Sequence, residues 1–409
     1  MHFDYLIIGG GLAAATAMKE LVRIDPGAGI GLIAEENEPP YDRPPLSKDF
    51  LLGKKPREGV FLLNDDFFSE NGIQAIWGRP AVSVDAERHR VTIENGGESG
   101  YNRLLIATGC RLRRLSCPGA DLPGLYYLRT LAESERLSRA AERGGQAVVI
   151  GGGFIGLEVA SVLSQLELSV TLIHRGERLL ENFGSEELST YYEELFASRG
   201  IHTVYKDEAA ELAGTDAVES VITKAGRILP CNFAVAGIGV FPDTGFLDGS
   251  GIESGNGVVV DERLRASAAD VYAAGDVANF FDPLFGWRRR IEHWDNAIRQ
   301  GRLAAVNMAG GSDSYSFISY FYSTMFGLTF EFFGDMQGCD ETIIRGSFDT
   351  RSAAVLYLHE GVLRAAFMQG RFLKERNVVK RLISERQSLE TVRGRLADES
   401  FDLEDALAP

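Results

Sequence analysis

The stretch FDYLIIGGGLAA, residues 3–14, joins a run of apolar residues to the glycine pattern G-x-G-x-x-A. Residues 3–8 predict a short buried strand, and the alanine-rich sequence after the glycines predicts a helix. In this turn Gly9 permits the tight bend, Gly11 lets the backbone approach a pyrophosphate, and Ala14 keeps the helix close to the sheet. The helix N-terminus adds free N–H groups and the positive end of a dipole. The stretch therefore predicts a dinucleotide-binding turn in an α/β sheet.

The same pattern occurs a second time further along the chain. The apolar residues 147–150 lead into GGGFIG at 151–156, and a predicted helix and a strand at 169–173 follow. The first motif is also followed by an acid, Glu35, where a carboxylate can accept hydrogen bonds from an adenosine ribose. One such pattern is a weak signal, but two in one chain, each between a strand and a helix, predict two dinucleotide sites. Two dinucleotides indicate FAD, which stays bound through turnover, and NAD(P)H, which delivers hydride.

Composition sets limits on the other classes of function. The 409 residues are 45% hydrophobic and 24% charged, which is typical of a globular protein and excludes a disordered chain. The net charge of −16 argues against nucleic-acid binding, which needs a basic face to replace phosphate counterions. No apolar run approaches the ~20 residues that span a bilayer, and the N-terminus lacks the pattern of an export signal. We therefore expect a cytoplasmic protein that binds neither nucleic acid nor membrane.

The cysteines and histidines form no recognisable metal or redox motif. The four cysteines include no C-x-x-C pair, and the six histidines include no pair at metal-ligand spacing. We therefore expect no metal site, and cysteines that are reduced and structural.

Four further segments carry a resemblance to a known family. They are EPPYDRPPLSK at residues 38–48, LLIATG at 104–109, VYAAGD at 271–276 and RIEHWDNA at 290–297. Together with the two glycine motifs, they resemble the FAD-dependent pyridine nucleotide-disulfide oxidoreductase superfamily. Within it the chain resembles the ferredoxin reductase branch, which has putidaredoxin-reductase-like and apoptosis-inducing-factor-like members. The resemblance covers nearly the whole chain.

The resemblance implies an α/β fold with two Rossmann-like dinucleotide-binding domains and a C-terminal α+β domain. The FAD-binding domain is expected to be discontinuous, with residues 1–112 as its first part and 240–310 as its second. The NAD(P)-binding domain is expected at 113–239, and the α+β reductase domain at 311–409.

The resemblance also implies roles for single residues. It places Arg43 and Arg129 near the FAD phosphates, where a guanidinium fork suits paired oxygens. It places Lys48 beside the flavin N5 edge in an ion pair with Glu158, and these two are the predicted catalytic residues because a cation there stabilises reduced flavin. Asp276 is expected to bind the ribityl chain. The other predicted cofactor-binding residues are Gly9, Gly11, Leu12, Ala13, Ala14, Glu35, Ala81, Ala107, Thr108, Gly109, Gly151, Gly153, Phe154, Ile155, Gly156, His174, Arg175, Gly239, Gly275, Glu292, His293, Trp294 and Tyr322.

Because the chain lacks a redox-active cysteine pair, we expect electrons to leave the flavin directly. Residues 41–48 contain no cysteine, although disulfide reductases of the superfamily place a redox pair there. We therefore expect hydride transfer from C4 of NAD(P)H to flavin N5, followed by two one-electron steps to an external carrier. The resemblance implies a [2Fe-2S] ferredoxin as this carrier, serving a cytochrome P450 or a ring-hydroxylating oxygenase. Because such ferredoxins are acidic, docking needs a basic patch, for which Arg288–Arg290 or the group of Arg111, Arg113 and Arg114 are candidates.

The residues that choose the nicotinamide donor lie after the strand at 169–173. NADH enzymes of this fold commonly carry an acid there, which bonds the ribose 2′-OH. Here His174 occupies the place of the acid, and Arg175 could meet a 2′-phosphate. The sequence therefore favours NADPH, or the use of both donors.

Two other functions stay open at this point. The segment YFYSTMFG at 320–327 also resembles monodehydroascorbate reductases, so a small radical or a quinone is an alternative acceptor. In this segment Tyr322 stands where many relatives have a tryptophan near the flavin. The second alternative is a redox-sensing flavoprotein with slow turnover. The sequence leaves both a monomer and a homodimer open.

Overall fold

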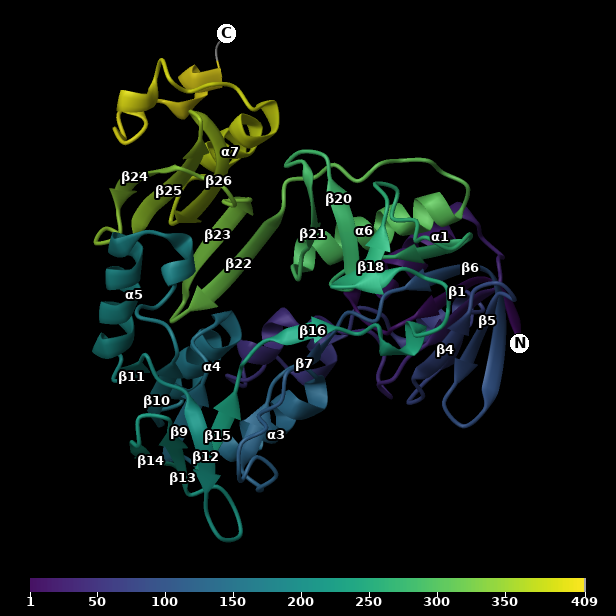
Figure 1. Ribbon diagram of the computed structural model, residues 1–409, viewed down its shortest axis with the longest axis horizontal. Coiled ribbons are helices and arrows are strands. Elements are labelled where there is room, and N and C mark those ends of the chain that lie inside the picture. The colour runs from purple at the N-terminus through teal and green to yellow at the C-terminus, as the bar shows by residue number, and fades with distance from the viewer. Residues whose placement is uncertain (408–409) are drawn as a thin grey trace. The chain divides into compact units, whose positions relative to one another are not determined.

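The computed structural model describes residues 1–407, and the chain divides into two compact units (Figure 1). Unit 1 comprises Met1–Asp42, Arg57–Arg111 and Val240–Ser319. Unit 2 comprises Arg43–Pro56, Leu112–Gly239 and the chain from Tyr320 onward. The short strands β7 (Cys110–Leu112) and β16 (Val240–Pro242) lie where the chain passes from one unit to the other.

Unit 1 is built on a seven-stranded sheet whose central strands are parallel. The order is β3-β2-β1-β6-β5-β4, and β19 pairs with the C-terminal part of β6 while β5 pairs antiparallel with its N-terminal part. Parallel strands are buried on both faces, and Leu6, Ile7 and Leu105 are accordingly fully buried. The strands are β1 (His2–Ile8), β2 (Ile30–Ile33), β3 (Gln74–Ile76), β4 (Ala81–Asp85), β5 (Arg90–Ile93), β6 (Gly97–Ile106) and β19 (Val271–Ala273).

Two helices of unit 1, α1 (Leu12–Ile24) and α6 (Trp294–Met308), pack closely against one another. Gly301 permits this approach, because a Cβ at that position would lie 2.4 Å from the carbonyl oxygen of Ala13. Unit 1 is completed by α2 (Asp65–Glu70) and a second sheet of β17 (Ser254–Gly255), β18 (Gly257–Val260), β20 (Ala278–Asp282) and β21 (Trp287–Arg290).

Unit 2 contains a five-stranded parallel sheet in the order β11-β10-β9-β15-β8. The segment between β11 and β15 forms a separate three-stranded antiparallel sheet in the order β12-β13-β14. The strands are β8 (Leu125–Tyr127), β9 (Gln146–Ile150), β10 (Ser169–His174), β11 (His202–Tyr205), β12 (Ala209–Ala213), β13 (Ser220–Thr223), β14 (Ile228–Pro230) and β15 (Phe233–Ala236). The helices are α3 (Leu131–Ala141), α4 (Phe154–Gln165) and α5 (Glu186–Ser198).

The C-terminal part of unit 2 is a five-stranded antiparallel sheet in the order β22-β23-β26-β25-β24, with α7 packed against β26 and β23 (Figure 1). Its strands β25 and β26 are hydrophobic along most of their length and almost entirely buried. The elements are β22 (Tyr320–Met325), β23 (Leu328–Gly334), β24 (Glu341–Ser347), β25 (Ser352–His359), β26 (Val362–Gln369) and α7 (Leu373–Glu385).

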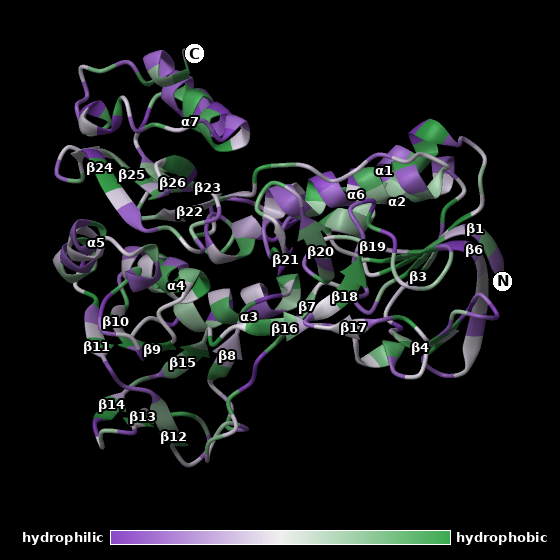
Figure 2. Ribbon diagram, turned by 45° about the horizontal axis from the view of Figure 1, so that its top comes forward, coloured by the Kyte–Doolittle hydropathy of each residue, from purple (hydrophilic) through white to green (hydrophobic). Residues whose placement is uncertain are grey.

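This architecture confirms the predicted fold class, with two Rossmann-like sheets and a C-terminal α+β part. The hydropathy colouring of Figure 2 shows hydrophobic residues along the sheet strands of unit 1, and polar residues on the outward turns of α5 and α7. The domain boundaries named above stay a prediction.

Candidate functional site

The first glycine turn, between β1 and α1, has no room for a side chain at Gly9. Gly9 has φ +110°, and a Cβ there would lie 2.3 Å from the carbonyl oxygen of Ala107. Gly11 is the N-cap of α1, and apart from Gly11 itself and its two chain neighbours no heavy atom of the described chain lies within 4 Å of the place where its Cβ would be. The backbone of the turn is therefore tight on the sheet side and open on the other. This cradle, at the N-terminus of a helix, fits a pyrophosphate group.

A buried amide beside this turn also fits a bound cofactor. Gln300 of α6 is fully buried, and its Oε1 accepts a hydrogen bond of 2.9 Å from the N–H of Gly275. Among the described residues its Nε2 has no hydrogen-bond partner. A Cβ on Gly275 (φ +82°) would lie 3.1 Å from the Ala13 side chain, so this second turn lies directly against α1. An unsatisfied buried donor at the cradle is what a bound acceptor would satisfy.

Residues 107–109, which follow β6, lie against the same glycine turn. Thr108 donates its hydroxyl to the carbonyl of Asp243 at 2.9 Å, and the N–H of Asp243 donates to the carbonyl of Gly109 at 3.0 Å. These two bonds hold the residues that follow Ala107 beside the glycine turn.

The predicted ribose acceptor is held in place by an arginine. Arg111 makes a bidentate ion pair with Glu35, with distances of 3.0 and 3.2 Å, and also bonds Asp243 at 2.8 Å. Each carboxylate oxygen of Glu35 keeps a free lone pair, which can accept a ribose hydroxyl. Arg111 is therefore ion-paired within unit 1, although its side chain is 45% exposed, and its part in a docking patch stays a prediction.

The predicted flavin-lining residues lie at the start of α6. Trp294 donates its indole N–H to Asp42 at 2.6 Å, and Glu292 is ion-paired with Arg290 at 2.6 Å. His293 is the N-cap residue of this helix. Burial, with a smaller contribution from Arg289, lowers the pKa of His293 to about 3. Asp276 follows Gly275 in the turn after β19, on the same side of unit 1.

The lowered pKa of His293 predicts a pH dependence of stability. The unfolded chain binds a proton on this imidazole below pH ~6.5, whereas the folded protein does so only below about 3. Stability should therefore fall as the pH drops below ~6.5, by about 1.4 kcal/mol per unit relative to a His293→Gln variant. Urea unfolding of the two proteins between pH 5 and 8 measures this difference, and parallel pH profiles would contradict the prediction.

The second glycine turn, between β9 and α4, repeats the construction of the first. Gly151 has φ +110°, and a Cβ there would lie 2.3 Å from the carbonyl oxygen of Gly237. A Cβ on Gly156 would lie 1.8 Å from the carbonyl oxygen of Gly151. Around the Cβ position of Gly153, in contrast, no heavy atom of the described chain lies within 4 Å. Unit 2 therefore has an open cradle of its own.

The side chains of Phe154 and Ile155, two predicted cofactor-binding residues of this turn, lie in different surroundings. The ring of Phe154 packs 5.1 Å from that of Phe321 and 6.0 Å from that of Phe183, so it belongs to an aromatic cluster. Its contact with a nucleotide would come from its main chain. The side chain of Ile155 is exposed.

A buried ion pair lies at the middle of α4. Lys48 and Glu158 are 2.7 Å apart, and the Glu158 residue is only 3% exposed. Glu158 also accepts hydroxyl hydrogen bonds from Ser47 at 2.5 Å and from Ser323 at 2.6 Å. The ring centroid of Tyr322 lies 5.9 Å from the Lys48 ammonium. The predicted pair is therefore present, while its place beside the flavin stays a prediction.

Sequence reasoning did not identify the two serines. They lie on segments far apart in the chain, and Ser47 could have been noticed only because it precedes Lys48 in the quoted motif. The Lys48 ammonium and the two serine hydroxyls all donate to this one carboxylate and fix its position, since a buried charged group needs hydrogen-bond partners.

The donor-selecting residues lie at the end of β10. The imidazole Nε2 of His174 lies 2.9 Å from the carbonyl of Arg178, and the ring occupies the space beside Gly152, whose Cβ would lie 2.3 Å from Nδ1. Arg175 is exposed, and no hydrogen bond or ion pair joins it to the rest of residues 1–407. Gly239 has φ +97° and accepts a hydrogen bond from the N–H of Arg113.

The cofactor contacts of four further predicted residues stay predictions. Arg43 and Arg129 belong to unit 2, whereas the first glycine turn belongs to unit 1, so their approach to the FAD phosphates stays a prediction. Ala81 begins β4, where it pairs with Ile93, and Leu12 begins α1.

The three consecutive arginines of β21 do not form the predicted basic patch. Arg289 is ion-paired with Asp282 at 3.3 Å, and Arg290 with Glu292. Arg288 is exposed, but its guanidinium donates to the carbonyls of Val260 and Asn279. The sequence shows three charges in a row, but two of them have carboxylate partners, Asp282 on the neighbouring strand β20 and Glu292 two residues after Arg290.

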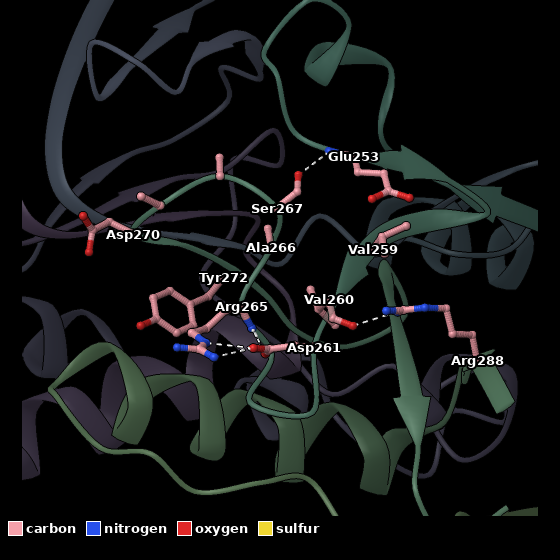
Figure 3. Close-up of a pocket in the computed structure, with 12 residues that line it drawn as sticks. Glu253, Val259, Val260, Asp261, Arg265, Ala266, Ser267, Asp270, Tyr272 and Arg288 are labelled. Atoms are coloured by element: carbon pink, nitrogen blue, oxygen red, sulfur yellow. Dashed lines mark hydrogen bonds and ion pairs between the residues drawn. The ribbon is translucent and has the colours of Figure 1, made fainter. Parts of the chain in front are cut away.

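A pocket of about 630 Å³ lies elsewhere in unit 1, between β18 and the loop that leads into β19 (Figure 3). Arg265 and Asp261 face it as an ion pair of 2.7 Å, and the Arg288 side chain lies at its rim. It contains none of the predicted cofactor residues.

Residues 1–407 contain neither a helix that could cross a membrane nor a cluster of metal-ligating side chains. No helix in this part of the chain has the length and apolar character needed to cross a membrane. No three His, Cys, Asp or Glu side chains in it gather closely enough to hold a metal ion.

Comparison with family models gives two matches. Residues 3–301 match the model described as pyridine nucleotide-disulphide oxidoreductase, and residues 320–407 match the one described as reductase C-terminal.

Named relatives match along most of the chain. The chain is 37% identical to the 5,5′-dehydrodivanillate O-demethylase ferredoxin reductase subunit of Sphingobium sp., with 88% of both proteins covered. It is 33% identical to rhodocoxin reductase of Rhodococcus erythropolis, over 84% of this chain and 81% of that protein. It is 32% identical to monodehydroascorbate reductase of Pisum sativum, over 98% of both.

Two solved structures share the fold closely. Putidaredoxin reductase in its covalent complex with putidaredoxin superposes with a TM-score of 0.94 at 29% identity, over 99% of this chain and 98% of that one. The ferredoxin reductase for the CYP199A2 system of Rhodopseudomonas palustris superposes with a TM-score of 0.93 at 32% identity, over 99% and 100%.

Proposed function

The chain belongs to the pyridine nucleotide-disulphide oxidoreductase family, and on that premise we propose that it passes electrons from NAD(P)H through FAD to a [2Fe-2S] ferredoxin. It is an NAD(P)H-dependent FAD oxidoreductase of the ferredoxin reductase type. The observation that carries the proposal is the pair of open glycine cradles, one in each unit, in a chain whose ferredoxin-reductase relatives match it from end to end.

The residues of the chain support direct transfer without a thiol relay. FAD, when bound, supplies a hydride acceptor at N5 and releases the electrons one at a time. Residues 41–48 contain no cysteine, and no disulfide joins any of the four cysteines of the described chain. Burial raises the pKa of both Cys231 and Cys339 to about 11, so these groups stay as unreactive thiols.

The Lys48–Glu158 pair is proposed to act on the flavin electrostatically. Glu158 and the two serines hold the Lys48 ammonium in one place, with the side chain 16% exposed. A fixed cation in a largely water-excluded site stabilises negative charge that develops nearby. This is the charge that reduced flavin carries.

The names of the relatives support a ferredoxin as acceptor. The Sphingobium sp. relative is a ferredoxin reductase subunit of an O-demethylase, and the R. palustris protein serves a CYP199A2 system. By analogy, we propose that the ferredoxin of this protein serves a P450 or another oxygenase. The second candidate acceptor is monodehydroascorbate, because the Pisum sativum reductase matches 98% of both chains.

Steady-state assays with three acceptors separate these functions. The proposal predicts that kcat/KM for a [2Fe-2S] ferredoxin exceeds that for monodehydroascorbate by about 100-fold or more, with ferricyanide as a control for electron supply. A higher kcat/KM for monodehydroascorbate would support the second candidate. Slow turnover with all three would favour a redox sensor.

We propose that the nicotinamide site accepts NADPH through Arg175. An Arg175→Ala variant should lose one charge-assisted hydrogen bond to a 2′-phosphate, so kcat/KM for NADPH should fall about 10- to 100-fold while that for NADH changes less than twofold. The matched control is Arg178→Ala, since Arg178 is already ion-paired with Glu193 at 2.8 Å. Equal losses for both donors in the Arg175 variant would contradict this role.

A further inference from the structure

One guanidinium of unit 1 joins two residues that are predicted to contact FAD. The side chain of Arg290, on β21, is only 11% exposed. Its Nη1 lies 3.0 Å from the carbonyl oxygen of Asp276 and 2.6 Å from the carboxylate of Glu292. The same nitrogen lies 3.2 Å from the sulfur of Cys110. Asp276 and Glu292 lie 16 positions apart in sequence (292 − 276), on different segments.

The other side of the guanidinium is fixed as well. The Nε of Arg290 donates to the side chain of Asn256 at 3.1 Å. The aliphatic part of the side chain lies against Gly257, where a Cβ would be 2.9 Å from Cδ. A planar guanidinium with partners on both sides has little freedom to turn, so the groups that it bonds are fixed relative to one another.

The positions of Asp276 and Glu292 connect the contacts of Arg290 to the predicted FAD site. Asp276 directly follows Gly275, the turn that lies against α1 beside the first cradle. Glu292 directly precedes His293, the N-cap of α6. Arg290 therefore links the turn after β19 to the N-terminus of α6, and both are predicted to line the flavin half of the site.

We propose that Arg290 is a positioning residue for FAD, which orients Asp276 and Glu292 and is not available to a docking partner. The inference rests on the proposed function, because it takes unit 1 as the FAD-binding unit. The sequence placed Arg290 in a surface patch, and its burial and contacts assign it to the interior instead.

Reconstitution of the apoprotein with FAD tests this role without any catalytic assay. For Arg290→Met we expect the FAD dissociation constant to rise by about 10- to 100-fold, because the charge-assisted bonds that hold both partners are lost. The FAD dissociation constant of Arg290→Lys should lie between those of the wild type and Arg290→Met, since an ammonium keeps the charge without the planar fork. The matched control is Arg288→Met, on the same strand, whose guanidinium donates to the carbonyls of Val260 and Asn279. That control should bind FAD as the wild type does.

A double-mutant cycle separates positioning from a general loss of stability. If Arg290 acts through Glu292, the two substitutions should not add. The FAD dissociation constant of the Arg290→Met/Glu292→Gln double variant should then be no higher than that of the single variant with the higher constant. An FAD affinity of Arg290→Met equal to that of the Arg288→Met control, or fully additive losses in the cycle, would overturn the proposal. Failure of the wild-type protein to bind FAD at all would instead overturn the proposed function.

Discussion

A Gly11→Val variant should fold normally and bind almost no FAD. Within the described chain a Cβ on Gly11 would face open space, so the added side chain fits the fold but fills the place proposed for the pyrophosphate. We expect the FAD dissociation constant to rise about 1000-fold, which corresponds to ~4 kcal/mol. The measurements are the flavin absorbance of the purified protein, reconstitution with added FAD, and the melting temperature of the apoproteins.

The matched control for this experiment is Gly9→Val. Its φ of +110° and the Ala107 carbonyl 2.3 Å from the Cβ position leave no room inside the protein, so this variant should be strongly destabilised. The two glycines thus separate a binding defect from a folding defect. A Gly11→Val protein that purifies with a full complement of FAD would rule out this cradle as the FAD site.

A Gly153→Val variant should keep its FAD and lose its reduction by NAD(P)H. Gly153 has the same open surroundings as Gly11, but it lies in the turn of unit 2. We expect the rate of flavin reduction at a fixed, subsaturating donor concentration to fall by about 100- to 1000-fold, because the donor pyrophosphate can no longer approach the backbone. Anaerobic stopped-flow with NADPH and with NADH measures this rate.

Dithionite provides the control for the second variant, since it reduces flavin without using the nucleotide site. Full bleaching by dithionite together with slow bleaching by both donors is the expected pattern. The opposite pattern in the two variants, with FAD lost from Gly153→Val and kept in Gly11→Val, would exchange the roles of the two units.

The parts of the fold that the sequence predicted are those determined by local backbone requirements. Gly9 and Gly151 both adopt φ +110° against a carbonyl of a neighbouring segment, so no other residue fits and the motif is visible in the chain. The Lys48–Glu158 pair was also predicted, although only through family resemblance. Spacing alone does not indicate that residues 110 positions apart (158 − 48) lie in contact.

The sequence could not predict the partners of charged and polar side chains. Ser47 and Ser323 meet at Glu158 from segments that only the fold brings together. Arg289 and Arg290 were misassigned to a docking surface, because the sequence alone does not show that Arg289 pairs with Asp282 on β20 or that Arg290 pairs with Glu292, two residues further on. Charge runs in a sequence therefore predict surface patches poorly when acidic residues, on a neighbouring strand or close by in the chain, pair with them.

Anaerobic reduction of the purified, FAD-loaded protein tests the central claim most directly. The protein is mixed with NADPH or NADH in a stopped-flow instrument, and a [2Fe-2S] ferredoxin is added in a second mixing step. We predict bleaching of the flavin at about 10 s⁻¹ or faster with at least one donor, and return of the flavin absorbance as the ferredoxin is reduced. A flavin that dithionite bleaches but neither nicotinamide donor does would contradict the account.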